Sequence, residues 1–156
     1  MKLGLIIVLC WLMAALLGPF YSVQALSVDL PAILSGPGES GLFGRDELGR
    51  DVLARVLAGA GVALWVSVLV VSLSAVIGTG IGLLAGYLGG WFDRITGRVI
   101  DVFLAFPGIL LAIALAAVLG PGLGNLVLAL SVMGWVGFAR LARAQTLSLR
   151  QPEHVQ

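Results

Sequence analysis

Few side chains in this sequence are of a type that carries out chemistry. Cys10 is the only cysteine and His154 the only histidine, so an intrachain disulfide and a cysteine-based metal cage are both excluded. We find no serine, histidine and aspartate at converging spacings, no paired carboxylates on one apolar face and no phosphate-binding loop. We therefore predict that the protein is not an enzyme and that it has neither a cofactor site nor a metal site. A lone histidine such as His154 is rarely a ligand or a catalyst.

Charged residues are densest between Arg45 and Arg55. Asp46 and Arg50, and likewise Asp51 and Arg55, carry opposite charges four positions apart, which is the spacing of ion pairs on one helical face. Apolar residues recur with helical spacing through the same stretch, at Leu48, Val52, Leu53, Val56 and Leu57. The pattern predicts a short amphipathic helix over 46–57. Two roles stay open for it: packing on the longer apolar segments, or contact with a substrate.

One further acid, Asp101, stands near the start of a long apolar segment. An acid inside a membrane span is a functional candidate, because a charge there is costly without a partner. Arg94 and Arg98 lie shortly before it in the sequence. We predict an ion pair between Asp101 and one of these two arginines at the membrane boundary.

The composition is that of a membrane protein. Of 156 residues, 60% are hydrophobic and only 11% are charged, with a mean hydropathy of +1.09. A soluble domain or a disordered chain of this length needs far more charge. The net charge of +1 favours no charged partner, and the absence of a basic stripe with interleaved aromatic residues argues against nucleic acid.

Four apolar segments are long enough to cross a hydrocarbon core of about 30 Å, since a helix rises about 1.5 Å per residue. They cover 3–26, 62–88, 99–119 and 123–141. Helices are expected because lipid offers the backbone no hydrogen bonds. The predicted fold class is all-α, a polytopic membrane protein with about four transmembrane helices. Lys2 and a small-residue cleavage site at 23–25 also fit a signal peptide, but we expect the first span to be retained.

Basic residues predict the orientation of these spans. One set of flanks carries six of them: Lys2, Arg94, Arg98, Arg140, Arg143 and Arg150. The other set carries three, all in the 22–61 loop, which also holds five acids. Because basic residues favour the cytoplasmic side, we expect the N-terminus, the 89–98 loop and the C-terminal end in the cytoplasm. The 22–61 loop and the turn at 120–122 then lie outside, on the periplasmic side in a bacterium.

Two features of the spans concern helix packing. Small residues recur at every fourth position of the second span, at Ser74, Gly78, Gly82 and Gly86. Such a ladder forms a groove that lets another helix approach closely, although a bending span is an alternative. Pro107 lies inside the third span, where the loss of a backbone hydrogen bond predicts a kink.

Three blocks of sequence resemble one family. The first, at 42–55, reads LFGRDELGRDVLAR, and the second, at 86–107, runs from GYLGGWFD through RVID to AFP. The third, at 137–150, runs from GFARLAR to SLR. Their order and spacing are similar to the permease subunits of bacterial ABC importers for dipeptides, oligopeptides and nickel, specifically to the second permease of each pair. The resemblance covers about residues 42–156.

The chain departs from this family's pattern in places. Arg45 stands where Thr is usual, Ala54 where Ser is usual, and His154 replaces a common aromatic residue. Family members continue with a Glu-Ala-Ala motif on a cytoplasmic helix that docks on the ATPase. The lead-in to that motif consists of Arg150, Glu153, His154, Val155 and Gln156. Two of the family's six spans follow it. We therefore expect a C-terminally truncated permease that inserts in the membrane without binding its ATPase stably.

The resemblance implies three parts: a first transmembrane helix over 1–26, a periplasmic loop with the amphipathic helix over 27–60, and the front of the permease domain over 61–156. It implies a subunit of the bacterial inner membrane that forms part of a path for peptides or nickel. The implied partners are a second permease, cytoplasmic ATPase subunits and a periplasmic solute-binding protein. A bulky residue at Gly82 is then expected to block assembly with the second permease.

Two alternatives from other classes stay open. An ion-coupled carrier should have charges at mid-depth in its spans, and the apolar segments carry none there. A non-transporting membrane fragment fits the expected truncation. The substrate among dipeptides, oligopeptides and nickel is not determined by these motifs.

Overall fold

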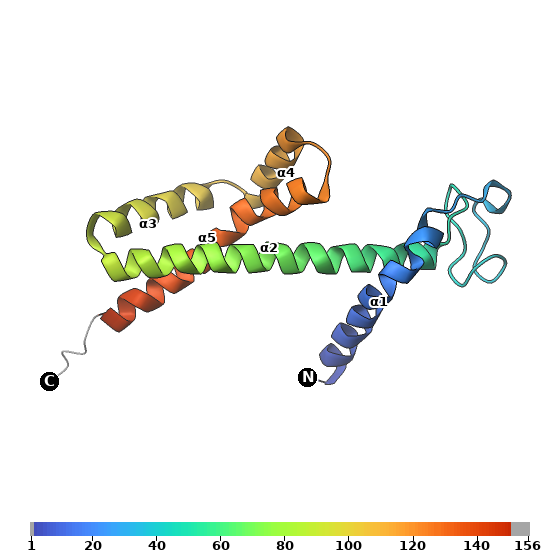
Figure 1. Cartoon of the computed structure of the whole chain (residues 1–156), viewed down its shortest axis with the longest axis horizontal. Coiled ribbons are helices and arrows are strands. Elements are labelled where there is room, and N and C mark those ends of the chain that lie inside the picture. The colour runs from blue at the N-terminus through green and yellow to red at the C-terminus, as the bar shows by residue number, and fades with distance from the viewer. Residues whose placement is uncertain (1, 151–156) are drawn as a thin grey trace. The chain divides into compact units, whose positions relative to one another are not determined.

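The computed structural model describes residues 2–150, and helices are the only regular secondary structure in that range (Figure 1). The elements are α1 (Lys2–Leu26), the 3-10 turn η1 (Leu30–Ala32), α2 (Val52–Leu88), α3 (Gly90–Ala105), α4 (Gly108–Leu119) and α5 (Leu123–Arg150). Over residues 2–150 there is no β-strand, only an isolated bridge between Arg45 and Asp51. The predicted all-α class is therefore confirmed for this part of the chain.

Three of these helices, α1, α2 and α5, are each long and apolar enough to cross a membrane. α3 and α4 meet the same criterion only as a pair, and the pair is bent by 87°. The segment 99–119 was predicted as one span with a kink at Pro107, and it forms two helices separated by a sharp bend at that residue. Pro107 lies in the break between Ala105 and Gly108. The residue before a proline is kept out of the helical region by steric clash, and Phe106 is accordingly extended, with φ −94° and ψ 141°.

The chain divides into two compact units, one ending at Ser67 and one beginning at Val68, and α2 is continuous through the boundary. α2 has 37 residues. At about 1.5 Å per residue it is about 55 Å long, well beyond the apolar core of a membrane. The second span was expected to begin at Val62, so residues 52–61 extend that helix at its outer end.

In the first unit, α1 and the start of α2 touch through their backbones. A Cβ atom added at Gly18 would lie 2.5 Å from the carbonyl oxygen of Leu57 and 3.3 Å from Cα of Gly61. One turn earlier on α1, the carbonyl oxygen of Ala15 would lie 3.1 Å from a Cβ added at Gly61. Earlier positions on α1 therefore face later positions on α2, and the two helices run antiparallel.

In the second unit, α2 and α5 run in the same direction, and α5 crosses the C-terminal half of α2 (Figure 1). Ser74 faces Gly134, and three turns further along α2, Gly86 faces Thr146. Since α2 and α5 end at the same side, the chain between them must return to the other side. We therefore predict that α3 and α4 together make one crossing, which gives up to four crossings with α1, α2 and α5.

The side-chain core of the second unit lies between α3 and α5. Phe103 and Trp135 meet edge to face, with ring centroids 5.6 Å apart and planes at 77°. They cover a small buried cluster formed by Ile100, Val136 and Ala139. This aromatic pair and cluster fix the side of α3 that faces α5.

The four crossings predict which positions face outside. In a Cys10→Ala background, the Glu39→Cys and Gly124→Cys variants should both react with an impermeant thiol reagent in intact cells. Gln145→Cys should react only after the cells are permeabilised. Glu39 and Gln145 are exposed, and a Cβ added at Gly124 has nothing within 4 Å, so these changes leave packing intact. If Gly124→Cys reacted only under the conditions that Gln145→Cys requires, α3 and α4 would form a re-entrant loop instead of a span.

Candidate functional site

The 27–51 loop of the first unit folds around the carboxylate of Asp46. Its Oδ1 accepts hydrogen bonds from the backbone N–H groups of Leu48 and Arg50, both at 2.9 Å. Its Oδ2 accepts from Nε of Arg50 at 2.9 Å and from Nη1 of Arg55 at 2.5 Å. Four donors on one carboxylate make a tight turn immediately before α2.

The predicted amphipathic helix over 46–57 is wrong in its first half. Gly49 has a φ of +70° and its backbone lies directly against that of Asp29, a conformation that a helix cannot adopt. α2 begins only at Val52, where Oδ1 of Asp51 accepts the N–H of Ala54 at 3.0 Å and caps the first turn. Arg55 consequently pairs with Asp46, and not with Asp51 as expected.

Arg45 connects three separate parts of the same loop. Its Nε donates to the carbonyl of Ser40 at 3.0 Å, and its Nη1 donates to the carbonyl of Gly49 at 2.8 Å. Nη1 also lies 3.4 Å from Oδ2 of Asp29. The residue that departs from the family's usual Thr is therefore the side chain that holds this loop together.

Hydrogen bonding sets the charge state of Asp46. Desolvation raises the pKa of this carboxyl, but hydrogen bonds from the Arg50 and Leu48 backbone and from the Arg50 side chain outweigh it and lower the pKa from 3.8 to about 2. Asp46 is therefore an anion at any ordinary pH. Its network braces the loop before α2 and offers no proton-transfer group.

In the second unit, the four small residues Ser74, Gly78, Gly82 and Gly86 all lie against α5. A Cβ added at Gly78 would lie 2.8 Å from Cβ of Phe138, and one added at Gly86 would lie 2.6 Å from Cβ of Thr146. The helix in the groove therefore belongs to the same chain, whereas the sequence had suggested a second permease. Only glycine permits this backbone approach.

Two buried hydroxyl groups lie in the second unit without a hydrogen-bond partner among the described residues: Oγ of Ser74 and Oγ of Ser131. Their residues are 1% and 7% exposed. Ser74 lies directly against Gly134 of α5, which has no side chain that could form a hydrogen bond with it. The outer part of the α2–α5 contact is thus held by close packing and not by hydrogen bonds.

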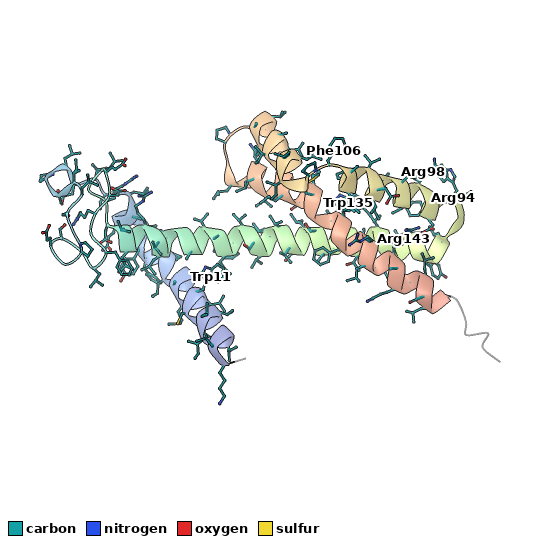
Figure 2. All side chains as sticks on the ribbon, turned by 180° about the vertical axis from the view of Figure 1, so that it is seen from behind. Trp11, Arg94, Arg98, Phe106, Trp135 and Arg143 are labelled. Atoms are coloured by element: carbon teal, nitrogen blue, oxygen red, sulfur yellow. The ribbon has the colours of Figure 1, made fainter. Side chains whose placement is uncertain are left out.

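A bidentate ion pair joins α3 to α5 near the inner end of the unit. Nε of Arg143 donates to Oδ1 of Asp93 at 2.5 Å, and Nη2 donates to Oδ2 at 2.9 Å. The side chains are only 28% and 18% exposed. Figure 2 shows Arg143 where α5 passes α3, with Arg94 and Arg98 on α3.

The predicted pair of Asp101 with Arg94 or Arg98 is wrong. It does not occur among the ion pairs of the described residues, and both arginines are exposed. Nε of Arg94 instead donates to the carbonyl of Gly90 at 3.2 Å. The observed pair links residues 50 positions apart, so no local spacing could have indicated it.

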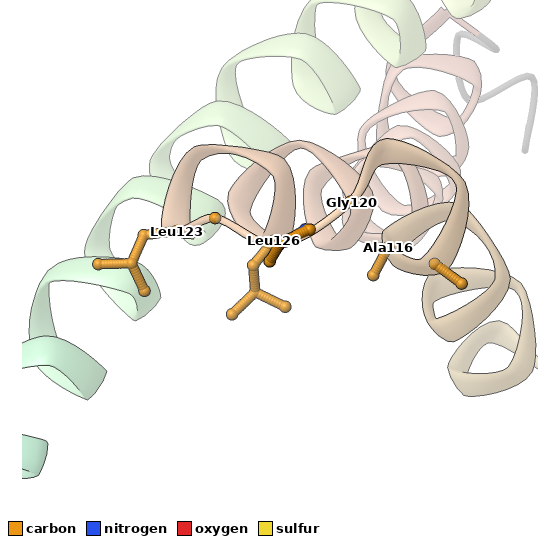
Figure 3. A pocket seen from close by; sticks show the side chains of 7 residues that line it. Ala116, Gly120, Leu123 and Leu126 are labelled. Atoms are coloured by element: carbon orange, nitrogen blue, oxygen red, sulfur yellow. The ribbon is translucent and has the colours of Figure 1, made fainter.

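An open hollow of about 610 Å³ lies beside the turn between α4 and α5 (Figure 3). The turn is closed by Asn125, whose Nδ2 donates to the carbonyls of Leu119 at 2.7 Å and Gly120 at 3.2 Å. The hollow is lined by Ala116, Ala117, Gly120, Pro121, Gly122, Leu123 and Leu126. No charged side chain lines it, so this surface offers nothing to fix a charged ligand.

The expected lead-in to an ATPase contact is only partly within the described residues. Arg150 is the last residue of α5. Glu153, His154, Val155 and Gln156 lie outside the described residues. Within the described residues, α5 continues as one helix from Leu123 to Arg150.

Comparison with known proteins agrees with this architecture. The profile of the family described as "Binding-protein-dependent transport system inner membrane component" matches residues 78–156. A dipeptide transport system permease protein of Alkalihalophilus pseudofirmus is 39% identical over 153 residues, which are 97% of this chain and 50% of that protein. Glutathione transport system permease proteins of Pectobacterium atrosepticum and Escherichia coli are each 44% identical over 128 residues, 82% of this chain and 42% of theirs.

The matched residues contain the groove glycines, the α3–α4 pair and α5, which together define a multi-pass membrane component and not an enzyme. The chain belongs to the family of inner membrane components of binding-protein-dependent transport systems. It spans about half the length of the curated relatives it matches. The predicted family is thereby confirmed.

Protonation of Asp46 is expected to loosen the outer loop. Because its folded pKa of about 2 lies below the ordinary 3.8, its contribution to stability is complete above about pH 4 and is lost as the pH falls through about 2. Hydrogen exchange at the Leu48 and Arg50 amides, relative to the intrinsic rate, should stay slow down to about pH 4 and rise below it. Asp46→Ala, which removes both acceptor oxygens, should exchange fast at every pH. Slow exchange in that variant would show that the carboxylate does not hold the turn.

A large side chain in the groove is expected to separate α2 from α5. A Cβ added at Gly82 would lie 2.9 Å from Cβ of Ala142 and 3.0 Å from the carbonyl carbon of Ala139. Gly82→Leu should therefore cost about 1–3 kcal/mol of stability, seen as a lower midpoint of thermal unfolding in detergent. Gly80→Leu is the matched control, because a Cβ there has nothing within 4 Å. Equal midpoints for the two variants would mean that the groove does not carry the contact.

Proposed function

We propose that this chain is part of the permease of an ATP-driven importer, and that it contributes helices to the path by which small peptides cross the inner membrane. The observation that supports this most directly is the family match over 78–156, which includes the three groove glycines, the broken α3–α4 span and α5. The chain would contribute no chemical step. Its part is to hold helices in two alternative packings while ATP is consumed elsewhere.

Peptides are the substrate class that the relatives favour. The relatives described above are dipeptide and glutathione transport permeases. Glutathione and dipeptides share a short backbone with a free carboxylate and a free ammonium group. We therefore put short zwitterionic peptides before metal ions as the cargo.

Three partners complete the proposal. A second permease subunit would cover part of the apolar helix surface that this chain leaves exposed. Only 11% of the most apolar stretch of α2 and 33% of that of α5 is buried. ATPase subunits would meet the cytoplasmic end of the chain beyond α5. A solute-binding protein would deliver the peptide on the outer side, where the Asp46 loop is expected to lie.

The test is a hybrid in which this chain replaces the aligned half of the Alkalihalophilus pseudofirmus dipeptide permease. Cells that also make the other subunits of that system should take up labelled dipeptide. A hybrid with Gly82→Leu should lose uptake and one with Gly80→Leu should keep it, because only the first meets α5. A hybrid that reaches the membrane at normal level yet imports neither dipeptide nor glutathione would refute the proposed function.

A further inference from the structure

The guanidinium group of Arg143 pairs with one carboxylate of α3, that of Asp93, and a second acid, Asp101, follows two helical turns later on α3. Asp93, Gly97 and Asp101 follow one another at intervals of four residues, so they are placed along α3 at steps of about 6 Å. Arg143 is bonded to Asp93 and extends over Gly97: its Nη2, Cζ and Nη1 atoms would lie 3.4, 3.5 and 3.6 Å from a Cβ added there.

Asp101 is the next acid along α3, one helical turn beyond Gly97, which the Arg143 guanidinium already covers. Asp101 is exposed and forms no ion pair among the described residues. Gly97 stands midway between the two acids and presents no side chain. The guanidinium can therefore pass from one carboxylate to the other along bare backbone.

A physical constraint makes the second carboxylate important. A partly buried arginine that is left without a counter-charge destabilises the fold, so a shift of α5 along α3 that merely breaks the Asp93 pair is unfavourable. A shift in which Arg143 exchanges Asp93 for Asp101 as its ion-pair partner keeps the arginine charge paired. The aromatic contact of Phe103 with Trp135 is apolar and adapts to a small displacement more easily than a lost ion pair does.

We propose that Arg143 exchanges between Asp93 and Asp101, and that the two pairings are two settings of the inner end of α5 relative to α3. On the proposed function, these settings belong to the two packings that a permease alternates between. Arg143 is then a positioning residue. It contacts no cargo, and it determines the position of the C-terminal end of α5. Asp93 holds it in the setting seen here.

The first test is a stability cycle with the 156-residue chain in lipid nanodiscs. Asp93→Asn should lower the thermal midpoint only slightly, because Arg143 moves to Asp101, and Asp101→Asn should hardly change it. The double variant should lose much more than the sum of the two shifts, because no acceptor remains. Arg94→Gln and Arg140→Gln, which remove exposed arginines from the same helices, are the controls. Additive shifts would overturn the exchange.

The second test follows the movement itself. Spin labels at the exposed residues Val102 and Gln145, in a Cys10→Ala background, report the distance between α3 and α5 in the same nanodiscs. Two distances are expected. Asp93→Asn should leave one of them, Asp101→Asn the other, and Gly97→Leu should abolish interchange by obstructing the passage. One distance that none of these variants alters would refute the proposal. Neither test involves transport, so a hybrid that fails to import peptides would reject the proposed function without deciding the exchange.

Discussion

Lipid gives two apolar helices no hydrophobic reason to associate, so the contact between α2 and α5 depends on how closely their backbones can approach. Four positions on α2 supply that closeness, and all four face α5. Because the contact runs in parallel from Ser74 to Gly86, it also fixes the direction of α5. The return crossing by α3 and α4, and with it the number of spans, follows from this one contact.

α5 is consequently the element around which the second unit is organised. It meets α2 through glycine, α3 through the Asp93–Arg143 pair and the Phe103–Trp135 contact, and α4 through the turn that Asn125 closes. These contacts differ in kind. Backbone packing against glycine tolerates almost no change in distance, whereas a long arginine side chain tolerates several ångströms. The contact of α5 with α2 is therefore held more rigidly than its contact with α3.

The features that could be predicted from the sequence are those with a local signal. Apolar runs located α1, α2 and α5, and spacing by four identified the groove, because both depend on residues close together in the chain. Two features had no such signal: Asp93 and Arg143 are 50 positions apart, and the Asp46 turn depends on a positive φ at Gly49. Pro107 indicated where the third span bends, but not that the bend is 87°. Spacing by four at 46–55 was misleading, since a turn can bring the same charges together.

The break at Phe106 and Pro107 has a consequence for where water must be. The last carbonyls of α3 and the first amides of α4 have no partners within their own helices, apart from the bonds that the N–H groups of Leu110 and Leu111 make to the carbonyl of Pro107. Hydrocarbon cannot accommodate bare peptide groups. The side of this span that bears them must therefore be turned away from lipid, toward other protein or a hydrated space. An interrupted helix in this way identifies the side of a span that faces away from lipid, which its apolar side chains alone do not reveal.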